Sequence, residues 1–167
     1  MIKDVIVEDA GKKGKGVFAL RNFKKGEFIF HYKKGRIVHR KDFAKLSHDN
    51  LDHLNEVDYD TFEIMRTPEK FINHSCEPNS IVKGRYLFAL KAIKKGEEIT
   101  GDYRINAFAK DRWRCYCGSK SCTGWIVGDF FSLPEKLQKK YLPYTIKVIR
   151  EEYKRRHRKK VPHCAFY

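Results

Sequence analysis

Residues 70 to 80 read KFINHSCEPNS, and this stretch directs the interpretation of the whole chain. A phenylalanine and an isoleucine are followed at once by asparagine, histidine, serine and cysteine, as expected when a short strand delivers a polar, reactive loop to a site. Three other interpretations are open. The Asn-His-Ser triplet fits an N-glycosylation acceptor, the cysteine could be a small buried residue, and the Glu-Pro-Asn that follows is ordinary turn sequence.

The composition is that of a folded intracellular domain. The chain has 167 residues, of which 41% are hydrophobic and 14% aromatic, enough for one domain with a real core. No apolar run approaches the roughly 20 residues of a membrane span, and the N-terminus lacks a signal-peptide pattern. An intracellular location removes most of the reason to expect glycosylation at Asn73.

The cysteine count and the net charge constrain the environment of the protein. Five cysteines, an odd number, argue against a disulfide framework and favour a reducing compartment. The net charge is +15, and the densest cationic run is KRRHRKK at residues 154–160. Such a run is typical of a solvated tail, and contact with nucleic acid or chromatin is the alternative.

An internal repeat indicates the fold class. FALRNFKKGEFI at residues 18–29 and FALKAIKKGEEI at residues 88–99 share most of their positions. Each reads as a strand, a Lys-Lys-Gly-Glu turn whose glycine supplies a positive φ, and a second strand. Other short β-rich runs are IKDVIVE, GRIVHR, FEIM, KFIN and RYLFAL. Many short strands with turn residues between them predict a mostly-β fold of several small sheets with short helices.

Helices are expected in the middle and at the end of the chain. The polar segment 40–61 predicts one or two short helices with loops. Ser132 with Glu135 three residues later is a capping-box pattern for a helix that ends before Pro143. A second helix is expected after this proline, docked by an apolar stripe and ending in a basic tail that frays into solvent. The stripe consists of Ile146, Ile149 and Tyr153.

The segment RCYCGSKSCTGW, residues 114–125, predicts a metal site. Cys115 and Cys117 flank one residue, which is too close for an easy disulfide but suits two thiolates that face one metal. With Cys122 they leave a tetrahedral Zn²⁺ one ligand short. We expect Cys76 to be the fourth ligand, with one of the seven histidines as the alternative, and we interpret Cys164 as a bystander.

A Cys₄ site would fasten the 70–80 stretch to the late cysteines. Zinc binding would then contribute to folding, because thiolate sites form together with the structure around them. Two alternatives remain at this point. The three late cysteines could be unrelated free thiols, and Cys76 could be a nucleophile with His74 as its base, which a metal-bound Cys76 would exclude.

Taken together, these motifs resemble those of SET-domain protein-lysine N-methyltransferases with a post-SET zinc segment. The resemblance covers roughly residues 3 to 127, and the motifs occur in the family's order. They are GKGVFAL (14–20), KKGEFIFHY (24–32), FINHSCEPN (71–79), KKGEEITGDY (94–103) and CYCGSKSCTGWI (115–126).

The resemblance implies a domain organisation and a fold. Residues 3–110 would form the SET domain and residues 111–127 the post-SET zinc-binding segment. Residues 128–160 would be a C-terminal helical extension with a basic tail. The implied fold is an arrangement of several small β-sheets, with knot-like threading of the C-terminal segment beside the Asn-His-Ser loop.

The resemblance also implies an active site. S-adenosyl-L-methionine and the substrate lysine would enter from opposite faces and meet in a narrow channel. Tyr103 would be the catalytic tyrosine and Tyr32 a channel-lining one, although the Lys33-Lys34-Gly35 that follows Tyr32 departs from the family's Y-x-G-E. The implied cofactor-binding residues are Gly14, Lys15, Gly16, Phe71, Asn73, His74 and Trp125, and for Trp125 an ordinary buried tryptophan is the alternative.

One departure bears on the product. The family has Phe or Tyr two residues before the catalytic tyrosine, where its bulk limits how many methyl groups the lysine can carry. This chain has Gly101 there. The missing ring leaves room, which favours di- or trimethylation.

The resulting functional prediction is an S-adenosyl-L-methionine-dependent protein-lysine N-methyltransferase with structural Zn²⁺. Its substrate would be a histone or another basic, chromatin-type protein, and its location nuclear in a eukaryote and cytoplasmic otherwise. Basic substrates require a local acidic groove that the sequence does not locate. The alternative function is a non-catalytic, zinc-stabilised module that binds nucleic acid or chromatin through the basic tail. Nothing in the sequence indicates an oligomeric state.

Overall fold

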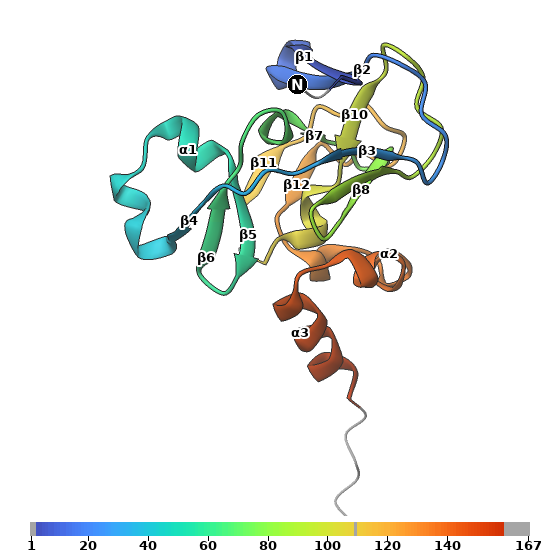
Figure 1. Ribbon diagram of the computed structural model, residues 1–167. Coiled ribbons are helices and arrows are strands. Elements are labelled where there is room, and N and C mark those ends of the chain that lie inside the picture. Colours follow the sequence, from blue (N-terminus) through green and yellow to red (C-terminus); the bar gives the residue numbers. More distant parts are fainter. Residues whose placement is uncertain (1–2, 109, 159–167) are drawn as a thin grey trace, which may run out of the picture.

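The computed structural model describes residues 3–108 and 110–158. In this part of the chain, short strands form four small sheets, and the helices α2 (Glu135–Tyr141) and α3 (Lys147–His157) lie together at one end (Figure 1). The mostly-β prediction is confirmed. Cys164 and residues 159–160 of the basic run lie outside the described residues. No helix in the described ranges is long and apolar enough to cross a membrane.

The largest sheet joins the N-terminal strands to the strand that begins the NHSC loop (residues 73–76). Its strand order is β1-β2-β10-β7. The strands are β1 (Val5–Asp9), β2 (Lys15–Ala19), β10 (Glu98–Gly101) and β7 (Asn73–His74). Because β7 pairs in parallel with β10, Asn73 lies opposite Thr100 and His74 opposite Gly101. This pairing brings the NHSC loop beside the residues that precede Tyr103.

Three smaller sheets complete the β structure. One has the order β3-β9-β8, with β3 (Phe28–His31), β9 (Tyr86–Ala89) and β8 (Ser80–Lys83). Another has the order β4-β6-β5, with β4 (Arg36–His39), β6 (Thr61–Ile64) and β5 (Leu54–Asp58). The last is a pair, β11 (Arg112–Arg114) and β12 (Trp125–Val127), which frames the late cysteines.

The two copies of the internal repeat pack against each other through matching hydrogen bonds. The turn residues Gly26 and Gly96 have φ angles of 81° and 80°, which explains why each turn carries a glycine. The Gly26 N–H donates to the Ala89 carbonyl over 2.8 Å, and the Gly96 N–H donates to the Ala19 carbonyl over 2.7 Å. Each copy therefore supplies the acceptor for the other copy's turn.

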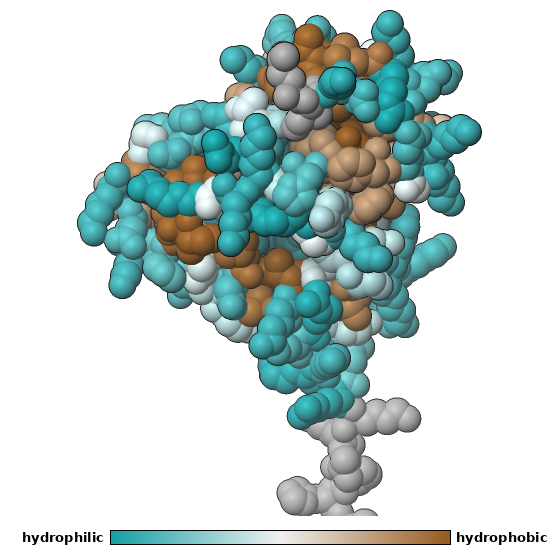
Figure 2. Space-filling model, viewed as in Figure 1, coloured by the Kyte–Doolittle hydropathy of each residue, from teal (hydrophilic) through white to brown (hydrophobic). Residues whose placement is uncertain are grey.

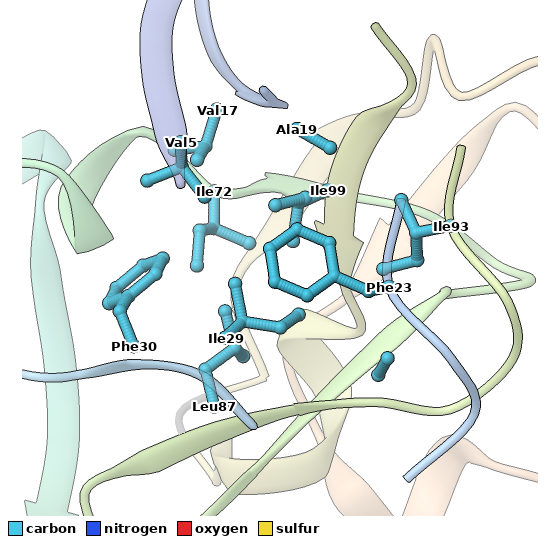
Figure 3. Packing of buried hydrophobic residues seen from close by; sticks show 11 residues of the cluster. Val5, Val17, Ala19, Phe23, Ile29, Phe30, Ile72, Leu87, Ile93 and Ile99 are labelled. Atoms are coloured by element: carbon cyan, nitrogen blue, oxygen red, sulfur yellow. The ribbon is translucent and has the colours of Figure 1, made fainter. Parts of the chain in front are cut away.

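The main hydrophobic core lies between these sheets (Figure 3). Phe23 and Ile93, one from each repeat copy, form a β-bridge and are almost completely buried. The other buried members are Val5, Val17, Ala19, Ile29, Phe30, Ile72, Leu87, Ala89 and Ile99. Burying a large aliphatic side chain contributes about 1.5–3 kcal/mol, so this cluster fixes β2, β7 and β10 relative to one another.

A second core cluster attaches the C-terminal helices to the β-rich part. Phe130 and Ile149 are fully buried and belong to one cluster with Ile81 of β8 and with Ile105. The predicted docking stripe is confirmed, since Ile146 and Tyr153 also pack against this cluster. Figure 2 shows hydrophilic residues on the outside of this end of the molecule.

Short 3-10 helices connect several strands. They are η1 (Gly11–Lys13), η2 (Arg40–Lys45), η3 (Glu69–Phe71), η4 (Tyr103–Asn106), η5 (Phe130–Ser132) and η6 (Leu142–Tyr144). In the polar middle, η2 and α1 (His48–Asp52) confirm the expected short helices. Strand β5 in the same segment was not predicted, because its side chains are only half-buried and show no clear alternation.

Two helix predictions need correction. The Ser132–Glu135 capping box does not form, because α2 begins at Glu135 after Pro134 and the Ser132 hydroxyl donates to the Asp129 carbonyl over 2.6 Å. The basic tail was expected to fray into solvent, but its residues 154–157 are helical because α3 continues to His157. The Glu152 carboxylate holds this last turn, accepting from Arg155 and Arg156 over 2.6 and 2.7 Å.

Candidate active site and metal centre

Four cysteine sulfurs meet between the NHSC loop and the β11–β12 segment. The Sγ atoms of Cys76, Cys115, Cys117 and Cys122 all lie within 4.8 Å of one another. Cys76 and Cys115 are 4.0 Å apart, close to the edge of about 3.8 Å in a tetrahedron with Zn–S bonds of about 2.3 Å. The late cysteines are therefore not unrelated thiols, and the four residues fit a structural Zn²⁺ site.

The pKa values of three cysteine thiols in the cluster are shifted in different directions. Burial raises the pKa of the Cys115 thiol to about 11 and raises that of Cys76 as well. For Cys117 burial acts in the same direction, but hydrogen bonds from Cys76 and Ser119 outweigh it and lower the pKa to about 6. Thiolates are the ligands that zinc requires, so metal binding here would release protons.

His74 lies beside this cluster but is arranged as a structural residue. Its Nδ1 accepts a hydrogen bond from the Tyr103 backbone N–H over 3.2 Å, so in the neutral ring the proton is on Nε2. Nε2 points at Cys76 Sγ, 3.3 Å away, as a donor. Burial lowers the pKa of His74 to about 4. This geometry gives no support to His74 as the base for a Cys76 nucleophile, or as the fourth metal ligand in place of Cys76.

Tyr32 and Tyr103 line one cavity of about 310 Å³. Tyr103 is 42% exposed as a residue, and its hydroxyl donates to the Ile72 carbonyl over 3.0 Å. Burial raises the pKa of the Tyr103 hydroxyl to about 12 and that of Tyr32 further. Both hydroxyl groups are therefore neutral at physiological pH.

The same cavity carries acidic side chains that the sequence did not single out. Glu63 is ion-paired with Arg85, and the Asp102 carboxylate accepts two hydrogen bonds from Arg104, over 2.8 and 2.7 Å. Glu69, buried directly before the NHSC motif, also lines the cavity. Glu63 and Asp102 are thus paired with arginines, and Glu69 accepts a hydrogen bond from the Lys33 backbone N–H. No local pattern marks them, because their burial depends on distant parts of the chain.

The predicted cofactor residues of β2 and β7 also meet. The Asn73 side-chain amide donates to the Lys15 carbonyl over 2.9 Å and to the Glu98 carboxylate over 2.8 Å. A Cβ atom at Gly16 would lie 2.8 Å from a Glu98 oxygen and 2.9 Å from the Ala10 Cβ, so a larger residue there would force its neighbours to shift. Gly14, at the C-cap of η1, precedes this strand. These contacts bring Lys15, Asn73 and Glu98 together at one corner between β2, β10 and β7.

Two aromatic residues of the predicted cofactor set lie on different elements. Phe71 ends η3, and the Lys15 ammonium lies 5.5 Å from the centre of its ring. Trp125 begins β12 and is 38% exposed, so the interpretation as an ordinary buried tryptophan is wrong. The Arg114 guanidinium lies 4.0 Å from the Trp125 ring centre. Arg112, at 5.3 Å, also lies over this ring, so the strand β11 supplies both of these cations.

Comparison with known proteins identifies the family. The family model of the SET domain matches residues 14–104, which include Gly14–Gly16, the NHSC loop and Tyr103. The chain belongs to the SET-domain family. Its fold is similar to the methyltransferase domain of human histone-lysine N-methyltransferase SETMAR in a crystal structure. The TM-score is 0.57 and the identity 28%, over 74% of this chain and 57% of that one.

Curated SET-domain relatives are larger proteins. Histone-lysine N-methyltransferase Set2 of Drosophila melanogaster is 34% identical over 71% of this chain and 6% of its own length. A Saccharomyces cerevisiae protein named histone-lysine N-methyltransferase, H3 lysine-36 specific, is 30% identical over 70% of this chain and 18% of its own length. The chain thus spans less than a quarter of these relatives.

Proposed function

We propose that this chain is a protein-lysine N-methyltransferase domain that uses S-adenosyl-L-methionine, with Zn²⁺ in a structural role. The observation that carries the proposal is the convergence of Tyr103 and Tyr32 on one cavity, in a SET domain whose β2–β7 corner holds Asn73. The relatives named histone-lysine N-methyltransferases support this reaction class.

The reaction requires a neutral amine in line with a methyl group. A lysine pKa of about 10.4 means that deprotonation at neutral pH costs about 4–5 kcal/mol. S-adenosyl-L-methionine, when bound, supplies the methyl group on a sulfonium. The apolar wall of the cavity, which includes Ile72 and Leu87, would favour the uncharged amine by excluding water. Holding the reacting atoms about 3 Å apart supplies much of the remaining acceleration.

The protein's own groups would orient the reactants. The neutral Tyr103 hydroxyl, held by the Ile72 carbonyl, would accept a hydrogen bond from the amine and contact the methyl group through its oxygen. Asn73 and the backbone of residues 14–16 would hold the amino-acid part of the cofactor. The His74 backbone and the exposed Trp125 ring would hold its adenine. Cys76, Cys115, Cys117 and Cys122 would hold Zn²⁺ and fasten this wall in place.

Space in the cavity supports transfer of more than one methyl group. Gly101 lines the cavity, and a Cβ added there would lie 3.6 Å from the Ile72 side chain, an ordinary contact. No aromatic side chain occupies this position two residues before Tyr103. We therefore propose di- or trimethylation as the outcome.

The substrate we propose is histone H3 or a similarly basic chromatin protein, which corresponds to nuclear action in a eukaryote. The names of the H3 lysine-36 specific relatives and the Glu69 carboxylate in the cavity support this choice. The proposed organisation is a SET domain at 3–110, a post-SET segment at 111–127 and a helical extension from 128. The second core cluster packs that extension against the SET domain.

The experiment that tests this function uses the purified chain with labelled S-adenosyl-L-methionine and core histones. Mass spectrometry of the products reports activity, target lysine and methyl count together. Transfer to a lysine that disappears in Tyr103→Phe supports the proposal. Absence of transfer to any lysine in histones and in a cell lysate contradicts it.

A nucleic-acid contact is the second candidate, and it can coexist with catalysis. The side chains of residues 154–158 at the end of α3 are exposed and mostly cationic. A DNA affinity that falls steeply as salt increases would support an electrostatic contact here. Negligible binding at low salt would exclude it.

A further inference from the structure

Glu69 is an acidic residue buried at the wall of the active-site cavity. It begins η3, directly before the NHSC loop, and is only 2% exposed. One carboxylate oxygen, Oε1, accepts a hydrogen bond from the Lys33 backbone N–H over 2.9 Å. The other, Oε2, is buried and has no hydrogen-bond partner within the described ranges 3–108 and 110–158.

The other carboxylates of the cavity have cationic partners. Glu63 is paired with Arg85, and Asp102 with Arg104. Glu69 Oε2 is the single buried side-chain nitrogen or oxygen atom without a partner in the part of the chain that the structure describes. Leaving a buried charged oxygen unpaired is costly, which indicates a site that a ligand completes.

The surroundings of Glu69 define the ligand. Tyr32 lines the same cavity as Glu69. Ile72, Val82 and Leu87 supply apolar walls to the same cavity. A single free oxygen suits a compact ammonium group, whereas a guanidinium prefers two parallel acceptors. The matching ligand is an aliphatic chain that ends in a protonated amine.

We propose that Glu69 is a substrate-binding residue whose Oε2 accepts a hydrogen bond from the ammonium group of the incoming lysine. The inference rests on the proposed function, because the target lysine of methyl transfer is the amine meant here. It adds that the cavity selects the charged side chain at binding, before the amine loses its proton to solvent. Tyr32 and Tyr103 then orient the neutral amine.

A direct binding measurement tests this without a known protein substrate. The full chain, with its tyrosine rings isotope-labelled, is titrated at pH 7 and constant ionic strength with n-butylammonium chloride and with 1-butanol. Both probes copy the end of a lysine side chain, and only one is charged. The wild-type protein is expected to bind butylammonium at least about tenfold more tightly, as for a hydrogen bond to a charged group.

Variants locate the effect at one oxygen. Glu69→Gln keeps the shape of the side chain and is expected to lose the preference for butylammonium, by about tenfold, with butanol affinity unchanged. Glu63→Gln is the matched control, because it removes a carboxylate of the same cavity that Arg85 already pairs. It is expected to leave the preference in place.

Several outcomes overturn the inference. They are equal affinities of the wild-type protein for both probes, no saturable butylammonium binding, an unchanged preference in Glu69→Gln, or an equal loss in Glu63→Gln. If Glu69→Gln does not fold, the comparison of butylammonium with butanol on the wild-type protein still tests whether the cavity prefers a charged amine. If the protein transfers methyl groups but binds butylammonium and butanol equally well, only the proposed role of Glu69 is refuted. If the protein prefers butylammonium but transfers no methyl group to any lysine, the ammonium site is supported and the proposed enzymatic function is refuted.

Discussion

Replacing Cys76 with serine is expected to release residues 111–126 from the protein while the main core stays folded. Cys76 is the one member of the sulfur cluster that lies outside this segment. Its loss leaves a tetrahedral site incomplete, so the zinc content of the purified protein should fall from about one ion per chain towards zero. Chelation of the wild-type protein should have the same effect.

The effect is expected to be large because few other interactions stabilise the folded state of residues 111–126. Within 111–126, Cys115 and Ile126 are the buried hydrophobic residues. Burial of Ile126 contributes about 1.5–3 kcal/mol, whereas ordering even five residues costs about 5–10 kcal/mol in backbone entropy. Structural zinc sites in small peptides supply about 10–16 kcal/mol. Without zinc, the ordered state of this segment is therefore unfavourable.

Hydrogen exchange with mass spectrometry is the assay, read peptide by peptide. In Cys76→Ser, amides of 111–126 should exchange as fast as in the unfolded chain, and amides of β2 and β9 should keep their protection. Cys164→Ser is the matched control and should change neither zinc content nor exchange. A Cys76→Ser protein that keeps one zinc ion and a protected 111–126 segment would refute the reasoning.

Three further predictions concern single positions. Tyr103→Phe should cost about 1–3 kcal/mol of stability, because it leaves the Ile72 carbonyl without its donor. Its methyl transfer should fall about 10²-fold or more through lost positioning, and a near-normal rate would contradict the assigned role. Gly101→Phe should shift the products toward monomethyl-lysine in mass spectra, because the ring would enter the cavity; unchanged trimethylation would show that other residues set the limit. Ile149→Ala should lower the free energy of unfolding in urea by about 2–5 kcal/mol, because the side chain is fully buried, and a loss below 1 kcal/mol would show that α3 is not part of the cooperative unit.

Local patterns in the sequence determined the class of fold and the family. Short strands and tight turns are specified by residues that are close together in the sequence. The positive φ angles of Gly26 and Gly96 agree with the turns predicted from Lys-Lys-Gly-Glu. The close spacing of Cys115, Cys117 and Cys122 likewise predicted, from the local sequence alone, that these thiols face one metal ion. The ordered motifs gave the SET-domain resemblance, which the match over residues 14–104 confirms.

Only the tertiary structure decided which distant groups meet. Cys76 joins the late cysteines because β7 pairs with β10 and carries the NHSC loop to them. Glu69 is buried because the Lys33 backbone and the cavity walls surround it, a contact across 36 positions of the sequence. Trp125 lies on the exposed face of β12, whereas its neighbour Ile126 is buried. Burial and charge pairing depend on long-range packing, and no local pattern of residue types contains that information.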